Sequence, residues 1–250
     1  MDASVHSDAG QGPVVVLLHG VGVGPASFDE LAGLLERDHR VVVVERPGGP
    51  SSAPSLEEQA DRVADLLVVS GASGGCVAGV SGGATLGLLL GIRRPEVVGG
   101  LVLHEPLVGP LAPMLHRRFV TAAQLAAEGD AGAISVVRAV MGEATWDRLS
   151  DADRAEVVDQ AARSRAEVAV FAAFAPTIDE LRSLRSIPTI VSIGGRSGPE
   201  RWEAAEAVQE HAGAELRVVP GSGNAAQLDA PGPLADVIRT CQPTAVPRSR

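Results

Sequence analysis

The sequence predicts an α/β fold built on a doubly wound, mostly parallel sheet. In residues 13–106, short β-branched runs alternate with segments of helical period, in the order strand, helix, strand, helix, strand, helix, strand. These runs are apolar along their whole length, which is typical of strands buried on both faces. At 250 residues the chain fits one large domain, or one domain with an insertion, without disulfides or a structural metal.

The first part of the chain supplies four of the expected strands. They are predicted at 13–18, 40–45, 76–80 and 97–103, with helices between them at 28–38, 55–69 and 84–92. Ser55 followed by Glu58 predicts a capping box that begins the second of these helices.

Residues 107–176 contain only helical patterns, at 117–128, 131–141 and 151–174. A helical insert after a central strand is a candidate lid, because lids shield chemistry from water. Strands are expected again at 187–193 and 216–219, and helices at 201–211 and 234–241. The predicted division is a core of residues 1–106 and 177–242, a lid of 107–176 and a frayed tail of 243–250.

Composition argues against several classes of partner. The net charge is −10, all 21 basic residues are arginines without a clustered stripe, and 2% of residues are aromatic, so nucleic acid is not an expected partner. No apolar run reaches the roughly 18 residues of a membrane span, so no membrane partner is expected. Cys76 and Cys241 fit small buried side chains in a reducing compartment. We expect a soluble, cytoplasmic protein, and the sequence leaves its oligomeric state open.

The clearest motif is Gly79-Val80-Ser81-Gly82-Gly83, which follows an apolar strand and opens a helix. A serine at such a strand-to-helix turn has its hydroxyl exposed at the sheet edge, and the helix N-terminus favours negative charge that develops there. A glycine-rich turn that only joins two elements remains the alternative, and the neighbouring motifs must decide between them.

The chain from residue 13 to 241 resembles the α/β-hydrolase fold family. Five motifs carry the resemblance in order: residues 19–20 (His-Gly), 46–49 (Arg-Pro-Gly-Gly), 79–83, 103–106 (Leu-His-Glu-Pro) and 220–223 (Pro-Gly-Ser-Gly). The family usually begins with two more antiparallel strands, for which residues 1–12 are too short. We therefore expect a version of the fold that is trimmed at its N-terminal edge.

The resemblance implies a role for several residues. Ser81 is the expected nucleophile, the backbone N–H groups of Val21 and Gly82 the expected oxyanion hole, and His19 a support for the first oxyanion loop. The family's acid commonly follows the strand that ends here at Ile193, but Ser197 stands in its place. Some members carry the acid one strand earlier, and that makes Glu105 the candidate, with a role as a helix-cap or arginine partner as the alternative.

The second departure from the family pattern affects the base. The family's catalytic histidine follows the last strand in a Gly-x-Gly-His loop, and here residues 221–224 read Gly-Ser-Gly-Asn. The amide of Asn224 has no titratable lone pair near neutral pH, so it cannot take the proton of Ser81. Loss of one triad member still leaves a rate enhancement of about 10³ to 10⁴ from the oxyanion hole and binding.

Several functions remain compatible with this pattern. One is a hydrolase whose base has moved, to His104, His116 or His211, or to Glu105 itself; His104 is expected near the site but pointing away from it. Another is a lyase, isomerase or cyclase that holds an enolate or polarised carbonyl with Ser81 and Asn224 as donors. A third is a binding protein that is inactive, naturally or through a deliberate replacement of histidine by Asn224.

The expected substrate is a small or medium apolar molecule with an ester or carbonyl group. The larger predicted lid residues would line its pocket, unless they serve only the lid's own packing; they are Met114, Met141, Trp146, Phe171 and Phe174. No residue set has the spacing of metal ligands, and residues 20–24 lack the spacing of a dinucleotide fingerprint. We therefore expect no metal and no cofactor.

Overall fold

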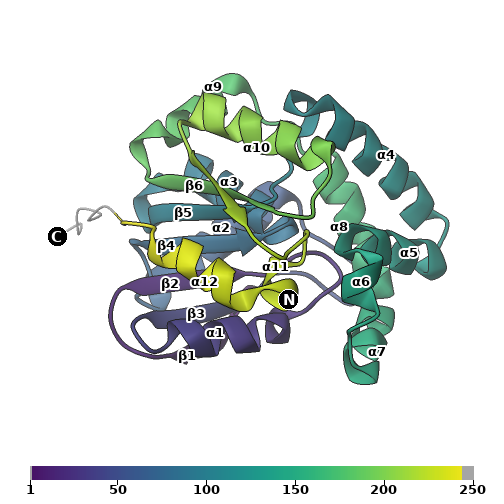
Figure 1. Cartoon of the computed structure of the whole chain (residues 1–250), viewed down its shortest axis with the longest axis horizontal. Coiled ribbons are helices and arrows are strands. Elements are labelled where there is room, and N and C mark those ends of the chain that lie inside the picture. Colours follow the sequence, from purple (N-terminus) through teal and green to yellow (C-terminus); the bar gives the residue numbers. More distant parts are fainter. Residues whose placement is uncertain (1, 244–250) are drawn as a thin grey trace.

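The computed structural model describes residues 2–243, and its centre is a sheet of seven strands (Figure 1). Their order across the sheet is β1-β3-β2-β4-β5-β6-β7, and every neighbouring pair is parallel except β1 and β3. The strands are β1 (Ser4–Ala9), β2 (Val14–Leu18), β3 (Arg40–Glu45), β4 (Gly75–Val80), β5 (Val98–His104), β6 (Thr189–Gly194) and β7 (Glu215–Val219). The α/β fold class predicted from the sequence is confirmed.

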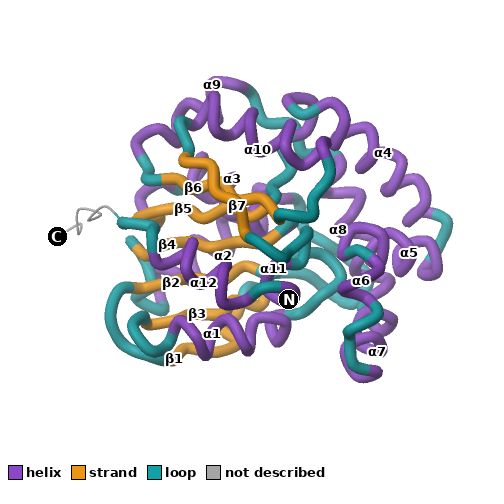
Figure 2. The backbone as a smooth tube through the Cα atoms, viewed as in Figure 1, coloured by secondary structure: helices purple, strands orange, loops and turns teal. Residues whose placement is uncertain are grey.

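Helices cover both faces of this sheet (Figure 2). One face carries α1 (Asp29–Leu35) and α12 (Pro231–Arg239), with the short α11 (Ala226–Asp229) beside them. The other carries α2 (Leu56–Val69), α3 (Gly82–Arg93), α9 (Ile178–Ser183) and α10 (Pro199–Ala212). The remaining helices follow β5 and are α4 (Pro113–Ala127), α5 (Asp130–Met141), α6 (Glu143–Trp146), α7 (Asp151–Asp159) and α8 (Ala161–Ala172).

The valines of β3 show how the strand pattern builds two hydrophobic layers. Val42 and Val44 belong to the cluster under α2 and α3, whereas Val41 and Val43 belong to the cluster under α1. All four side chains are at most 1% exposed, and full burial of each contributes roughly 1.5–3 kcal/mol. A continuous apolar run therefore identifies a central strand of this sheet.

Element ends differ from the expectations by a few residues. The last helix ends at Arg239, so Cys241 lies just beyond it, and the predicted helix at 151–174 is two helices, α7 and α8. The side chain of Ser55 accepts a hydrogen bond from the Glu58 N–H at 3.2 Å, which is the serine half of the predicted capping box at the start of α2. The Glu58 carboxylate pairs with Arg62 instead of completing the box. Of the predicted tail, residues 244–250 lie outside the described residues.

The polar N-terminal stretch, which received no element in the sequence analysis, forms strand β1. It pairs antiparallel with β3, from Ser4 opposite Glu45 to Ala9 opposite Val41, and its side chains are mostly exposed. An edge strand with little burial lacks the apolar run that marks the central strands. This is why the sequence analysis predicted no strand at these residues.

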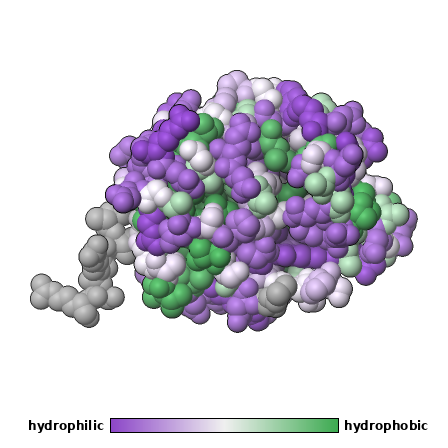
Figure 3. Space-filling view, turned by 90° about the horizontal axis from the view of Figure 1, so that it is seen from below, coloured by the Kyte–Doolittle hydropathy of each residue, from purple (hydrophilic) through white to green (hydrophobic). Residues whose placement is uncertain are grey.

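The segment from 107 to 176, called the helical insertion below, packs beyond the carboxyl ends of the strands (Figure 1). Helices α4, α5 and α8 pack on one another, and a small cluster with Ala126, Ala133, Val136 and Val168 fills the space between them. Figure 3 shows a mostly hydrophilic face with separate hydrophobic areas. Within residues 2–243 no helix has both the length and the apolar character that crossing a bilayer would need.

Two positions at the turn after β4 must be glycine, because backbone segments approach each other closely there. A Cβ atom on Gly83 would lie 1.9 Å from the Leu18 carbonyl oxygen of β2, and one on Gly79 would lie 2.3 Å from the Gly83 carbonyl oxygen. Real side chains do not approach backbone this closely, so β2, β4 and α3 meet only because these positions are glycine.

We predict that Gly83→Ala lowers the free energy of unfolding by more than about 3 kcal/mol, at the upper end of single-substitution effects. Urea unfolding of the unaltered chain and of Gly83→Ala measures this difference in free energy. Gly33→Ala in α1 is the matched control, since no atom lies within 4 Å of its added methyl group, and it should stabilise the helix by up to about 1 kcal/mol. Equal effects of the two changes would contradict the packing account.

Candidate active site

Ser81 occupies the sharp turn between β4 and α3. Its backbone has φ 53° and ψ −116°, and its N–H donates to the His104 carbonyl of β5 at 2.8 Å. Within residues 2–243, the only non-glycine residues with positive φ are Ser81 and Glu105, which follow neighbouring strands. Strained backbone of this kind costs free energy and concentrates at functional sites, so the two residues mark one location at the sheet edge.

Two backbone donors lie beside Ser81. The loop after β2 passes close to it, since a Cβ on Gly20 would be 3.4 Å from the Ser81 Cβ, and one on Gly82 would be 3.2 Å from Val21 Cγ2. No described residue accepts a hydrogen bond from the N–H of Val21 or of Gly82. Gly82 is the first residue of α3, where N–H groups lack helical partners, so a ligand oxygen can use both donors.

Glu105 lies directly after β5 with its carboxylate 0% exposed. One oxygen accepts hydrogen bonds from the Gly194 N–H at 3.0 Å and from the Ser197 hydroxyl; the other forms a 3.4 Å ion pair with Arg201 Nε. Burial alone would raise the pKa of Glu105, but Arg201, His104 and the hydrogen-bond donors lower it below its ordinary value. The side chain is therefore an anion at neutral pH.

Asn224 reaches Glu105 from the loop after β7. Its Nδ2 donates to Glu105 Oε2 at 2.9 Å, and Asn224 and Ser81 line one small cavity of about 30 Å³ with Gly20 and Val21. The fold thus brings three residues together: Ser81, Asn224, which lines a cavity with Ser81, and Glu105, whose buried carboxylate accepts a hydrogen bond from Asn224. Position 224 holds an amide, however, and no described residue makes a hydrogen bond with the Ser81 hydroxyl.

The candidate replacement histidines all lie elsewhere. The buried ring of His104 accepts from the Ser192 hydroxyl at Nδ1, and its Nε2 donates to the Gly223 carbonyl, each at 3.0 Å. Burial lowers the pKa of His104, so the ring is neutral and supports the loop that carries Asn224. His116 lines a separate cavity, and His211 pairs with Glu210 in the last turn of α10.

Side chains from the helical insertion enclose Ser81. A cavity of about 20 Å³ beside it is lined mainly by Val21, Leu107, Phe119, Val168 and Phe171. Of the large insertion residues named above, Met141 and Phe171 line cavities that contain Ser81, while Phe174 is buried in the core, Trp146 packs in a cluster with Leu149, and Met114 is 38% exposed. The cavities beside Ser81 are therefore small and lined mostly by apolar side chains.

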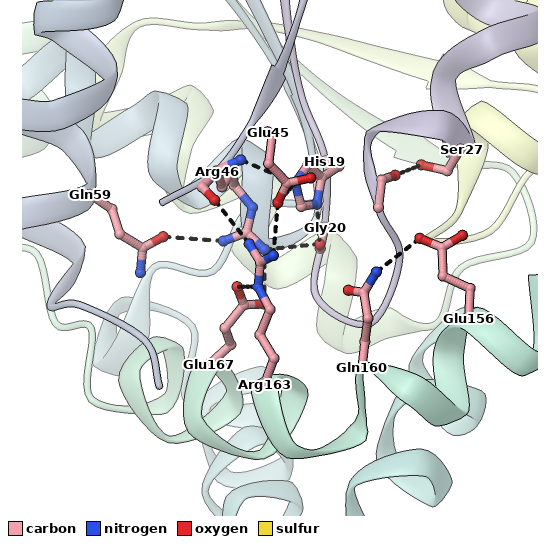
Figure 4. Close-up of polar contacts among 11 residues, drawn as sticks. His19, Gly20, Ser27, Glu45, Arg46, Gln59, Glu156, Gln160, Arg163 and Glu167 are labelled. Carbon is pink, nitrogen blue, oxygen red and sulfur yellow. Dashed lines mark hydrogen bonds and ion pairs between the residues drawn. The ribbon is translucent and has the colours of Figure 1, made fainter. Parts of the chain in front are cut away.

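Figure 4 shows the polar network that holds the loop after β2. The buried His19 ring accepts from the Arg46 N–H at Nε2 and donates from Nδ1 to the Gly20 carbonyl. Burial and Arg46 lower the pKa of His19, in agreement with a neutral ring in this tautomer. Arg46 Nη2 also donates to the Gly20 carbonyl at 3.0 Å, so His19 acts on the loop backbone and does not contact the Ser81 hydroxyl.

The same network ties the insertion to the sheet. Arg46 forms a fully buried 2.8 Å ion pair with Glu167 of α8, and Arg163 of α8 bridges Glu167 and Glu45 at 3.1 and 2.7 Å (Figure 4). Sequence analysis assigned Arg46 only to a motif and missed this contact, because Arg46 and Glu167 are 121 positions apart. An arginine directly after a buried strand was the one available signal.

Asp229 is a second contact that the sequence analysis missed. Its buried carboxylate accepts from the Gly223 N–H at 2.9 Å, from the Thr145 hydroxyl of α6 at 2.6 Å and from Arg196 at 2.6 Å, and it also pairs with Arg148. Asp229 thereby joins the loop before Asn224 to the insertion.

Within residues 2–243, no group of three or more histidine, cysteine or acidic side chains is arranged to hold a metal ion.

Comparison with known proteins agrees with this arrangement. Residues 15–237 match the sequence family described as the alpha/beta hydrolase family. The chain belongs to the α/β-hydrolase family. The serine at the turn after β4 belongs to one of the five motifs on which the sequence resemblance was based.

Relatives of this α/β-hydrolase chain are hydrolases and esterases. It is 33% identical over 122 residues to an uncharacterized hydrolase, YraK, of Bacillus subtilis, and 32% identical over 103 residues to a pimeloyl-[acyl-carrier protein] methyl ester esterase of Vibrio campbellii. The matched segments span 46% and 41% of this chain, and 44% and 41% of these relatives, so less than half of each curated protein is covered.

Two solved structures share the fold over nearly the whole chain. A thermophilic esterase from Thermogutta terrifontis has a TM-score of 0.76 at 22% identity and covers 95% of this chain and 91% of its own. The carboxylesterase CesB from Bacillus subtilis has a TM-score of 0.74 at 18% identity, with 93% and 85% coverage. At these identities the likeness establishes the architecture of the α/β-hydrolase chain.

We predict that the contribution of Glu45 to stability depends on pH. Burial opposes its ionisation, but His19, when its ring is protonated at low pH, and Arg163 lower the pKa of Glu45 from 4.5 to about 2. A depressed carboxylate pKa stabilises the fold above the ordinary value, and this stability is lost as the pH falls toward the folded value. Urea unfolding should show Glu45→Gln less stable than the unaltered chain at pH 7, with the gap narrowing from about pH 5 to about pH 3.

Glu206→Gln is the control for this measurement, because Glu206 is exposed on α10 and forms no ion pair with any residue of the described range 2–243. Its unfolding curve should follow that of the unaltered chain across the same range. A gap for Glu45→Gln that stays constant between pH 7 and pH 3 would show that the carboxylate is not stabilised by its neighbours.

Proposed function

We propose that this protein is an α/β-hydrolase-fold enzyme that acts on a small or medium apolar ester or carbonyl compound through Ser81 and an oxyanion hole. The observation that carries the proposal is the positive-φ turn at Ser81 together with the unused N–H groups of Val21 and Gly82 beside it. Donors fixed in this way stabilise negative charge on a substrate oxygen without reorganisation. The apolar lining of the Ser81 cavity supports an apolar reacting group.

In the proposed reaction, Ser81 Oγ forms a bond to the ester carbonyl carbon, and the carbonyl electrons move onto the oxygen held by Val21 and Gly82. Collapse of this intermediate breaks the bond from the carbonyl carbon to the alkoxy oxygen, which takes a proton from water and leaves as the alcohol. A second water then adds to the acyl carbon, the bond to Ser81 Oγ breaks, the acid leaves, and Ser81 Oγ regains a proton from water. The proton of Ser81 passes to water, because Asn224 has no basic lone pair at the position of the expected histidine. Acylation is therefore slow, and the helical insertion acts as the lid that limits water at the site.

A second candidate function rests on the hydrogen bond between Asn224 and Glu105. An amide held by a buried carboxylate is a fixed polar group, so a lyase, isomerase or cyclase can use Ser81 and Asn224 to hold a polarised carbonyl or enolate. Such an enzyme needs no acyl-serine. Formation of a covalent adduct on Ser81 separates the two candidates.

We predict that Asn224→His increases the rate of Ser81 acylation by about 10² to 10⁴, the usual contribution of a general base. Histidine at this position would lie between the Ser81 cavity and the carboxylate of Glu105, which orients the ring. Intact-mass spectrometry after exposure to a fluorophosphonate and, separately, to an activated ester measures the adduct. Ser81→Ala in the Asn224→His background should remove it.

Asn224→Gln is the matched control, because it keeps the amide and adds no base, so its labelling should not rise. Slow labelling of the unaltered chain that disappears in Ser81→Ala supports the ester-directed function. If Asn224→His gains no labelling, the side chain at 224 does not face Ser81, and the proposed catalytic arrangement is wrong.

A further inference from the structure

A second, larger cavity lies on the other side of Asn224 from Ser81. It has a volume of about 520 Å³ and is bounded by α4, α5 and α6 and by the loops after β6 and β7. Ser81 does not line it, whereas Asn224 lines both this cavity and one that contains Ser81. Phe119, Val136 and Val140 likewise line it and the apolar cavity beside Ser81. A molecule bound across this wall would have one end at Ser81 and the other in the larger cavity.

The buried cation of the larger cavity is Arg201, which lies in the first turn of α10 and is 8% exposed. Its Nε faces Glu105 Oε2 at 3.4 Å, and its guanidinium carbon lies 5.9 Å from the centre of the Phe119 ring. Its Nη1 is buried and has no hydrogen-bond partner. Nη1 has no accessible surface, so a ligand in the cavity cannot reach it. No described residue accepts a hydrogen bond from Nη2 either, and Nη2 is therefore the guanidinium nitrogen that can donate to a ligand.

The acidic side chains of the cavity already have donors. Glu105 accepts from Gly194, Ser197 and Asn224, Glu200 pairs with Arg118 of α4, and Glu143 pairs with Arg138. The remaining charged lining residue, Arg196, pairs with Asp229. The unmet hydrogen-bonding capacity among these groups is therefore that of a cationic donor. A charged N–H donor binds an anionic oxygen, such as that of a carboxylate, more strongly than a neutral oxygen.

We propose that the Arg201 cavity binds a carboxylate group of the substrate, so that the preferred compounds are esters that also carry a free carboxylate. The apolar part of such a half-ester crosses the wall at Phe119 and Val140, and its ester group lies at Ser81. The exposed Arg118 lines the same cavity and adds positive charge at its surface side. The inference rests on the proposed function for the placement of the ester, but binding of the carboxylate needs no turnover.

The test compares half-esters with neutral diesters by isothermal titration calorimetry. Ser81→Ala prevents consumption of the ligand, and monomethyl esters of the four- to eight-carbon straight-chain dicarboxylic acids are titrated beside their dimethyl esters. At the best chain length the half-ester should bind at least about tenfold tighter, which is 1.4 kcal/mol. Equal affinity for half-ester and diester at every length would overturn the proposal.

Substitutions test whether Arg201 is the source of the half-ester preference. Arg201→Gln should abolish the preference, and Arg201→Lys should keep part of it because the charge stays while the fork is lost. Arg182→Gln, an exposed arginine of α9 that pairs with Asp179, is the matched control and should keep the preference in full. If Arg201→Gln does not fold, Arg118→Gln is used, for which a preference reduced by about half supports the assignment and an unchanged one contradicts it.

The outcome is separable from that of the proposed function. A half-ester preference in Ser81→Ala, with no ester cleaved and no Ser81 adduct in the unaltered chain, retains the carboxylate site and rejects the hydrolase. Ester cleavage by the unaltered chain, without a half-ester preference in Ser81→Ala, supports the hydrolase and rejects the carboxylate site.

Discussion

The carboxylate of Glu105 is the contact on which the site depends. It follows β5, accepts hydrogen bonds from Gly194 and Ser197 after β6, and accepts another from Asn224 after β7, so one buried anion joins the carboxyl ends of three strands. Arg201 offsets its charge from α10. A buried carboxylate without these partners would be costly, so the loops and the acid hold one another in place. These contacts therefore tie together the carboxyl ends of β5, β6 and β7 beside Ser81.

This arrangement explains both departures from the family pattern. Ser197 stands where the family commonly has its acid, and its hydroxyl donates to the acid that Glu105 supplies from the neighbouring strand. In the proposed site, Glu105 supplies the acid one strand earlier than is common in the family, and an amide stands at the position of the family's base. Because Glu105, the positive-φ turn at Ser81 and the free N–H groups are all present, we propose that the site can stabilise negative charge on a substrate but has no side chain that takes the serine proton.

The sequence predicted the central strands, the serine turn and the helical insertion because those features are local. Val41 to Val44 indicate a buried strand, and Gly79 to Gly83 indicate a close backbone approach. Motif order also placed Glu105 and Asn224 together, although they are 119 positions apart. Strand β1 is polar and therefore gave no signal. The pairs Arg46–Glu167 and Arg201–Glu105 depend on the packing of distant helices, which no local pattern encodes.

The most direct measurement is the pH dependence of Ser81 acylation in the unaltered chain, followed by intact mass with an activated ester. The central claim is that the site stabilises an oxyanion without a general base. It predicts no sigmoidal step in the acylation rate near the ordinary histidine pKa of about 6.5, because Asn224 does not titrate and no histidine lines the Ser81 cavities. A rate that rises through that range and then levels off would show a working base and contradict the claim.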